Sequence, residues 1–162
     1  MITTPDAPEY MPFGEHFFTV LQGLVILVYG LTTIYPEGVR PNSAETLDDY
    51  DPTKDVVQKL YPFFQDVHVM IFIGFGFLMS FLKTMSWTAL SYNWIISIWA
   101  FQFAILSVGF WHQVFGDKPF ARIEVNLESM ILGDFGAGAA MITFGVLLGK
   151  ANLQQLMFLV FW

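Results

Sequence analysis

The feature that most constrains this chain is a series of long apolar runs. Residues 88–111 form a run of 24 residues without a charged side chain, and residues 17–35 are also uncharged. Residues 63–82 and 129–149 are nearly as apolar. A helix needs about 20 mainly apolar residues to cross the hydrocarbon core of a bilayer. The sequence therefore predicts four membrane-spanning helices.

The composition supports a membrane protein and excludes several other classes. The 162 residues are 55% hydrophobic and only 13% charged, about half the charged fraction of a typical soluble domain. Seven basic against 14 acidic residues give a net charge of −7, which argues against a nucleic-acid partner. Cysteine is absent, and no histidine spacing typical of a metal site occurs. We expect no metal, no cofactor and no enzymatic activity.

A fifth apolar run, residues 153–162, continues to the last residue of the sequence. Ten residues of helix rise only about 15 Å, which is half of a bilayer. We expect the sequence to be an incomplete membrane domain, either a fragment or a short isoform. The alternative is a short interfacial helix that closes a small protein.

An acidic segment, residues 36–62, lies between the first two predicted helices. Its prolines indicate an irregular extramembrane loop, with at most a helical turn over 53–60. Its carboxylates could concentrate cations electrostatically, although a solvated loop without a role explains them as well. The next connection, residues 85–87, is very short and predicts an antiparallel helical hairpin.

The residue that stands out inside a predicted span is Asp134. A carboxylate within a membrane helix usually has a partner or faces a polar pathway. Either reading fits: a carboxylate satisfied by amides or by a neighbouring helix, or one at the mouth of a pathway. Phe135 and Ile142 share one helix face among small residues, as expected for close packing or for an apolar pore wall.

Asp66 and His68 stand near the start of the second predicted helix. Residues two apart on a helix face different sides, so we do not expect these two to pair.

The stretch 64–79, FQDVHVMIFIGFGFLM, strongly resembles the signature of Rh glycoproteins, the animal branch of the ammonium transporter/Rh superfamily. Further similarities follow in order at Asn93, at 126–127, at 134–135 and at 144–150. The resemblance implies an all-α, polytopic transmembrane bundle that assembles as a trimer. This chain would supply the N-terminal part: an extra helix, three core helices and the opening of a fourth.

The resemblance also implies site residues. Phe135 falls at the outer phenylalanine gate of the family, and Phe75 and Ile142 fall at the pore wall. Asp134 would be a pore-mouth or structural acid, and Asp66 and His68 a structural signature. The twin pore histidines of the family would lie beyond residue 162. We expect no histidine of this chain to replace them, because none is predicted to lie in the middle of a helix.

The function implied is ammonium transport, in which NH4⁺ is recruited and deprotonated and NH3 is conducted, with CO2 as a further substrate. We expect the chain alone not to conduct. The alternative is a non-transporting subunit that pairs with full-length Rh proteins. A multi-pass protein of the plasma membrane is implied, with the N-terminus inside the cell, although basic residues near the helix ends favour the opposite orientation.

Overall fold

The computed structural model describes residues 12–36, 56–82, 86–116 and 122–161. It divides the chain into two units, Met1–Thr32 and Thr33–Trp162. The first unit contains helix α1, Pro12–Thr32. The elements of the second unit are, in order, β1 (Thr33–Ile34), α2 (Val56–Val69), the π-helical turn η2 (Met70–Gly74), α3 (Phe75–Ser80), α4 (Ser86–Phe115), β2 (Ile123–Glu124), α5 (Leu127–Leu147) and α6 (Leu153–Leu159).

Three helices among the described residues are long and apolar enough to cross a membrane: Val57–Ser80, Ser86–Phe115 and Leu127–Leu147. The predicted all-α, polytopic membrane bundle is thereby confirmed. The apolar part of α1, His16–Thr32, is shorter, so a membrane crossing by α1 stays a prediction. The predicted run 153–162 contains the seven-residue helix α6.

The second span begins earlier than the sequence predicted. Helix α2 starts at Val56 rather than at residue 63, and so takes in the end of the predicted loop. Lys59 and Tyr61 interrupt the apolar run in the sequence, but both side chains are exposed, while Leu60 between them is half-buried. Polar residues that face outward do not stop a helix. The acidic residues of the loop, 37–55, lie outside the described residues.

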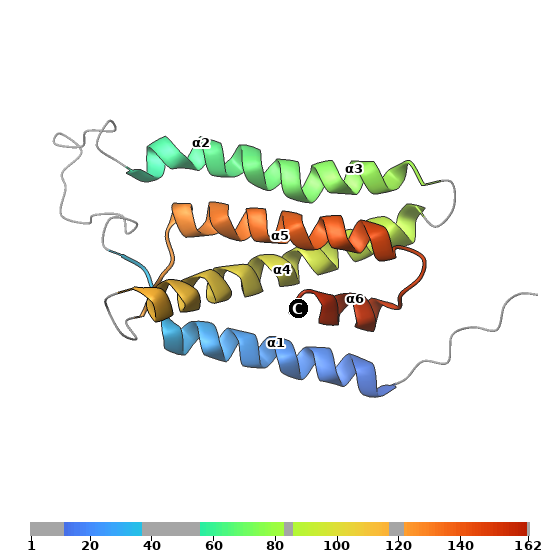
Figure 1. Cartoon of the computed structure of the whole chain (residues 1–162), viewed down its shortest axis with the longest axis horizontal. Coiled ribbons are helices and arrows are strands. Elements are labelled where there is room, and N and C mark those ends of the chain that lie inside the picture. The colour runs from blue at the N-terminus through green and yellow to red at the C-terminus, as the bar shows by residue number, and fades with distance from the viewer. Residues whose placement is uncertain (1–11, 37–55, 83–85, 117–121, 162) are drawn as a thin grey trace, which may run out of the picture. The chain divides into compact units, whose positions relative to one another are not determined.

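Helices α4 and α5 lie side by side along much of their length (Figure 1), while α2 packs mainly against α5 and α3 against α4. Glycines bring α4 and α5 close. A methyl group added at Gly136 would lie 2.6 Å from Cβ of Ala104, and one at Gly133 would lie 2.7 Å from Cγ1 of Ile105. Small residues allow such contact between membrane helices. The packing interpretation of the glycines in α5 therefore holds at these two positions.

A two-residue parallel ladder closes one end of the second unit. Thr33 pairs with Ile123 and Ile34 with Glu124, and the backbone N–H of Val125 donates to the carbonyl of Ile34 at 3.0 Å. The first predicted helix was expected to reach residue 35, but it ends at Thr32 because the next two residues are extended in this ladder.

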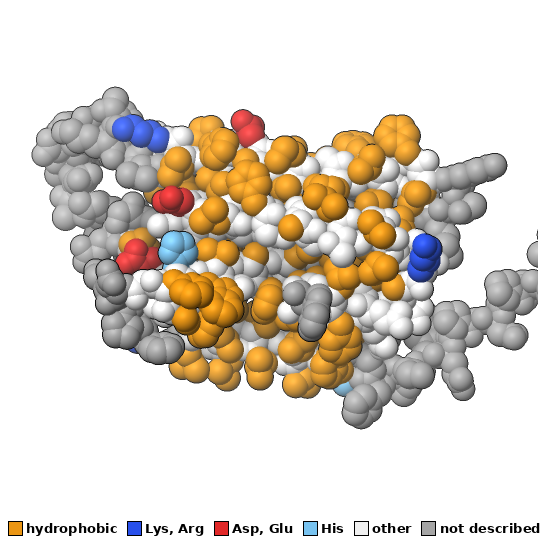
Figure 2. Space-filling model, viewed as in Figure 1, with side chains coloured by type: hydrophobic (Ala, Val, Ile, Leu, Met, Phe, Trp, Pro, Cys, Tyr) orange, Lys and Arg blue, Asp and Glu red, His pale blue; other side chains and the backbone are white. Residues whose placement is uncertain are grey.

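Hydrophobic side chains cover much of the visible surface of the helices (Figure 2). Large apolar residues are exposed on every described helix of the second unit. Such a surface is costly in water and favourable in hydrocarbon. The fold therefore fits a lipid environment.

Candidate functional site

The centre of the candidate site is a contact between two helices that the sequence did not reveal. Nδ1 of His68, on α2, lies 3.0 Å from Oδ1 and 3.3 Å from Oδ2 of Asp134, on α5. The Asp134 side chain is fully buried, whereas that of His68 is 39% exposed. In the neutral tautomer whose Nδ1–H donates a hydrogen bond to the carboxylate, Nε2 carries a free lone pair. The pair thus places a proton acceptor beside a buried acid.

This contact identifies the partner of Asp134. The carboxylate is held by a neighbouring helix, and its partner is His68. The expectation that no histidine lies in the middle of a helix is wrong for His68, which is the twelfth of the 24 residues of the span Val57–Ser80. It was placed near a helix end because the helix was predicted to begin at residue 63.

Aromatic rings surround the His68 imidazole. Its centroid lies 4.3 Å from that of Phe72, 5.2 Å from that of Phe64 and 5.8 Å from that of Phe101. The first two neighbours come from the same span, and Phe101 comes from α4. Aromatic faces attract a cation within about 6 Å. The rings therefore suit either a neutral imidazole or an imidazolium at this position.

Phe135 and Ile142 lie on the outer face of α5. They are 50% and 64% exposed, and Leu132 and Val146 extend the same stripe at helical spacing. Asp134, next to Phe135 in sequence, is fully buried. The structure therefore brings Asp134 together with His68, and it leaves Phe135 and Ile142 on a different side of the same helix.

The two remaining predicted residues lie on the second span. Phe75 is half-buried in α3, and Asp66 is exposed in α2. The only bond to a carboxylate that His68 makes among the described residues is to Asp134. Asp66 and His68 therefore share a helix without forming a pair.

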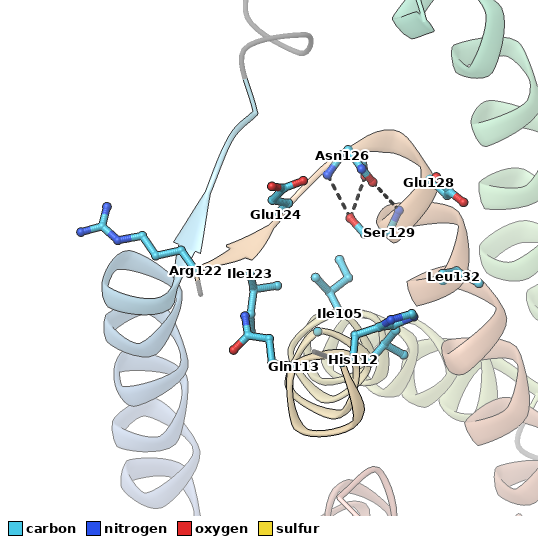
Figure 3. A pocket seen from close by; sticks show the side chains of 13 residues that line it. Ile105, His112, Gln113, Arg122, Ile123, Glu124, Asn126, Glu128, Ser129 and Leu132 are labelled. Carbon is cyan, nitrogen blue, oxygen red and sulfur yellow. Dashed lines mark hydrogen bonds between the residues drawn. The ribbon is translucent and has the colours of Figure 1, made fainter. Parts of the chain in front are cut away.

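A cavity of about 590 Å³ opens where α4 ends and α5 begins. Asn126 and Ser129 cap α5 beside it: the Ser129 N–H donates to Oδ1 of Asn126, and the Asn126 N–H donates to Oγ of Ser129 (Figure 3). The carboxylates of Glu124 and Glu128 lie on either side of this cap. Leu132, one turn before Phe135, also lines the cavity. Arg122 lines the cavity together with these two carboxylates, so the cavity lies at a charged end of the bundle and reaches Leu132 on the outer face of α5.

Within the described residues, no group of three or more histidine, cysteine or acidic side chains is placed to hold a metal ion. The arrangement offers hydrogen bonding, proton exchange and aromatic contact to a small polar molecule.

Comparisons with known proteins identify the family of the chain. The profile described as Ammonium Transporter Family matches residues 50–162. The chain is 37% identical to Ammonium transporter Rh type B of Danio rerio over 138 residues. This aligned region covers 85% of this chain and 29% of that protein. It is 38% identical over 141 residues to Ammonium transporter Rh type C-like 2 of Danio rerio, covering 85% and 28%.

Ammonium transporter Rh type C of Xenopus tropicalis is 37% identical over 136 residues, covering 82% of this chain and 28% of that protein. The chain spans less than a third of the length of these curated relatives. The relatives are named as transporters and not as enzymes. The profile match covers most of the chain, and three apolar helices are long enough to span a bilayer. This integral membrane protein belongs to the ammonium transporter family.

Proposed function

We propose that the chain contributes to the transport of ammonium and ammonia across a membrane. The observation that carries the proposal is the family match over residues 50–162, together with relatives named Rh-type ammonium transporters. The physical reason for a protein pathway is solvation. Moving bare NH4⁺ into hydrocarbon is very costly, whereas neutral NH3 crosses an apolar passage easily. NH4⁺ is therefore deprotonated before NH3 is conducted, and CO2 is a second neutral substrate.

Phe135 is the outer gate of this proposed pathway, and Ile142 and Phe75 belong to its wall. The shared exposed face of Phe135 and Ile142 supports the assignment, since a pore wall needs side chains that no helix of the bundle covers. Asp134 supports the mouth of the pathway from behind this face, and His68 holds its carboxylate. Asp66 and His68 serve the structure of the second span.

The chain alone is not expected to conduct, because the described helices leave the outer face of α5 uncovered. Further helices, from a longer polypeptide or from related full-length subunits in a trimer, would close the pathway. The protein acts in the plasma membrane, and the reaction is transport rather than catalysis.

The test is a chimera. The segment of zebrafish Rh type B that aligns with this chain is replaced by the chain, and the chimera is reconstituted into liposomes that contain a pH-sensitive dye. Ammonia entry raises the internal pH. We expect ammonia flux from the chimera and none from the 162-residue chain. A chimera that assembles as the parent does but shows no flux contradicts the proposed function.

The gate is tested in the same chimera with Phe135→Ala. We expect a changed flux, or a changed ratio of ammonia to methylamine flux. The matched control is Phe77→Ala, which removes an exposed ring of α3. If both variants conduct like the parent, the gate assignment is wrong while the transport proposal stands.

The second candidate is a non-transporting subunit that pairs with full-length Rh proteins. The uncovered apolar face of α5 favours it, since such a face needs a protein or lipid neighbour. Co-purification of the chain with the co-expressed zebrafish protein, without flux from the chain alone, distinguishes this role.

A further inference from the structure

The second span carries one π-helical turn, η2, between α2 and α3. Buried positions in an α-helix recur every three or four residues. In this span Val67 and Ile71 are four apart and Gly76 and Met79 are three apart, but Ile71 and Gly76 are five apart. The wider step falls at η2. A π turn takes up one extra residue, so η2 keeps the buried stripe on one side of the span.

An uninterrupted α-helix would present different residues to the bundle. In such a helix, Gly74 and Leu78 would share a face with Ile71, because they follow it by three and seven residues. Both are exposed in the structure, Leu78 to 61%. Gly76 instead faces α4, where an added methyl group would lie 3.0 Å from Cδ1 of Leu90. The packing of α3 against α4 therefore depends on the extra residue in η2.

Asn93 of α4 contacts this turn directly. Its side chain is fully buried, and its Nδ2 donates to the carbonyl of Phe72, within η2, at 3.4 Å. Its Oδ1 is buried without a partner among the described residues. Asn93 thus makes its one observed side-chain hydrogen bond to η2. The backbone bonding of this turn departs from the α-helical pattern. A leucine would fill similar space without leaving an acceptor unpaired.

The same turn reaches the candidate site. The ring of Phe72 lies 4.3 Å from that of His68, and His68 binds Asp134. We infer that Asn93 is a positioning residue: it stabilises the π turn and, through Phe72, holds His68 in place against Asp134. This role does not depend on whether the chain takes part in transport.

The first test uses the full chain in lipid nanodiscs and compares Asn93→Leu with Ser97→Ala. Ser97 is the control for loss of a buried polar group, since it is buried one turn further along α4 and its hydroxyl donates to the backbone carbonyls of Asn93 and Trp94, which Asn93→Leu keeps. The readout is the ¹⁵N NMR signal of the His68 side chain, with His16 and His112 replaced by Gln. We expect Asn93→Leu to abolish the signature of Nδ1 bonded to a carboxylate, and Ser97→Ala to keep it.

The second readout is cross-linking, which the lack of native cysteine makes specific. A disulfide between Gly76→Cys and Leu90→Cys reports that α3 packs against α4. A disulfide between Ile71→Cys and Gly138→Cys reports that the second span packs against α5. We expect Asn93→Leu to lower the equilibrium constant for packing of α3 against α4 about five- to tenfold, the effect of one lost hydrogen bond, and so to lower the Gly76–Leu90 yield. Ser97→Ala leaves both yields unchanged.

Deleting Ile73, an exposed residue of η2, tests the turn itself. The deletion removes the extra residue and places Gly76 four residues after Ile71, so the span continues as an uninterrupted α-helix with the same buried side, and both cross-links are kept. Loss of one cross-link in the deletion variant would mean that η2 does not take up an extra residue, and it overturns the role of the turn. Unchanged readouts in Asn93→Leu, or equal losses in Ser97→Ala, overturn the role of Asn93.

If Asn93→Leu does not fold, Asn93→Ala and Asn93→Gln are compared by the same readouts. Gln retains the N–H donor, and Ala does not. Loss in the Ala variant with retention in the Gln variant supports the proposal, and identical behaviour of the two contradicts it.

Discussion

Nδ1 of His68 lies 3.0 Å from Oδ1 of Asp134, although 66 residues separate them in the chain. The two partners differ in burial, since Asp134 is inaccessible and His68 is partly exposed. Removal of His68 and removal of Asp134 therefore have unequal effects on stability. A buried group that loses its partner carries the full cost of its desolvation, whereas an exposed group can turn to solvent.

This asymmetry predicts that His68→Leu lowers the free energy of unfolding by about 1–3 kcal/mol, and that Asp134→Leu lowers it by less. The double variant should recover part of the loss, because no buried carboxylate then remains. Unfolding of the chain in mixed micelles by added denaturing detergent measures all three. Equal and additive losses from the two single variants would argue against the pair.

The close approach of Gly136 to Ala104 can be tested by a rescue experiment. Gly136→Ala places a methyl group 2.6 Å from Cβ of Ala104, a contact that only movement of α4 or α5 can relieve. We expect lower stability, and recovery when Ala104→Gly is added. Gly23→Ala in α1 is the control, because nothing lies within 4 Å of the added methyl group. A double variant no more stable than Gly136→Ala alone would count against this close approach.

Two phenylalanines of α5 predict opposite outcomes. Phe144 is fully buried, so Phe144→Ala should cost about 3–5 kcal/mol of unfolding free energy. Phe135 is half exposed, and Phe135→Ala should cost much less. The same unfolding measurement compares them. A large loss for Phe135→Ala would mean that its ring packs within the bundle and is not available to a pathway.

Gly149 predicts a backbone effect. Its φ of 76° between α5 and α6 lies in the left-handed region, which costs a residue with a side chain about 1–2 kcal/mol. Gly149→Ala should therefore destabilise the chain although no atom lies within 4 Å of the added methyl group. Gly149→Asn should cost less, since asparagine tolerates this conformation. Equal stability of wild type and Gly149→Ala would exclude the strain.

The sequence predicted the helical membrane bundle because uncharged runs of sufficient length have few other stable solutions. It did not predict where the second helix begins, because the exposed side chains of Lys59 and Tyr61 resemble the end of a span when only hydropathy is considered. An amphipathic reading of residues 56–62 would have extended the helix and placed His68 near its centre.

The candidate site was only partly predictable. Asp134 stood out because a lone carboxylate in an apolar run needs a partner, but no local spacing identifies a partner on another helix. The π turn was equally hidden, since Met70, Ile71, Phe72 and Ile73 have ordinary helical composition. The gate role of Phe135 came from family resemblance, and it stays a prediction.

The pairing of Thr33–Ile34 with Ile123–Glu124 has a consequence for biosynthesis. The ribosome makes the second strand 90 residues after the first, which takes roughly 5–20 s at common elongation rates. Until then the exposed backbone groups of the first strand have only water or the translocation machinery as partners. This end of the protein therefore matures late, after the intervening helical hairpin has emerged.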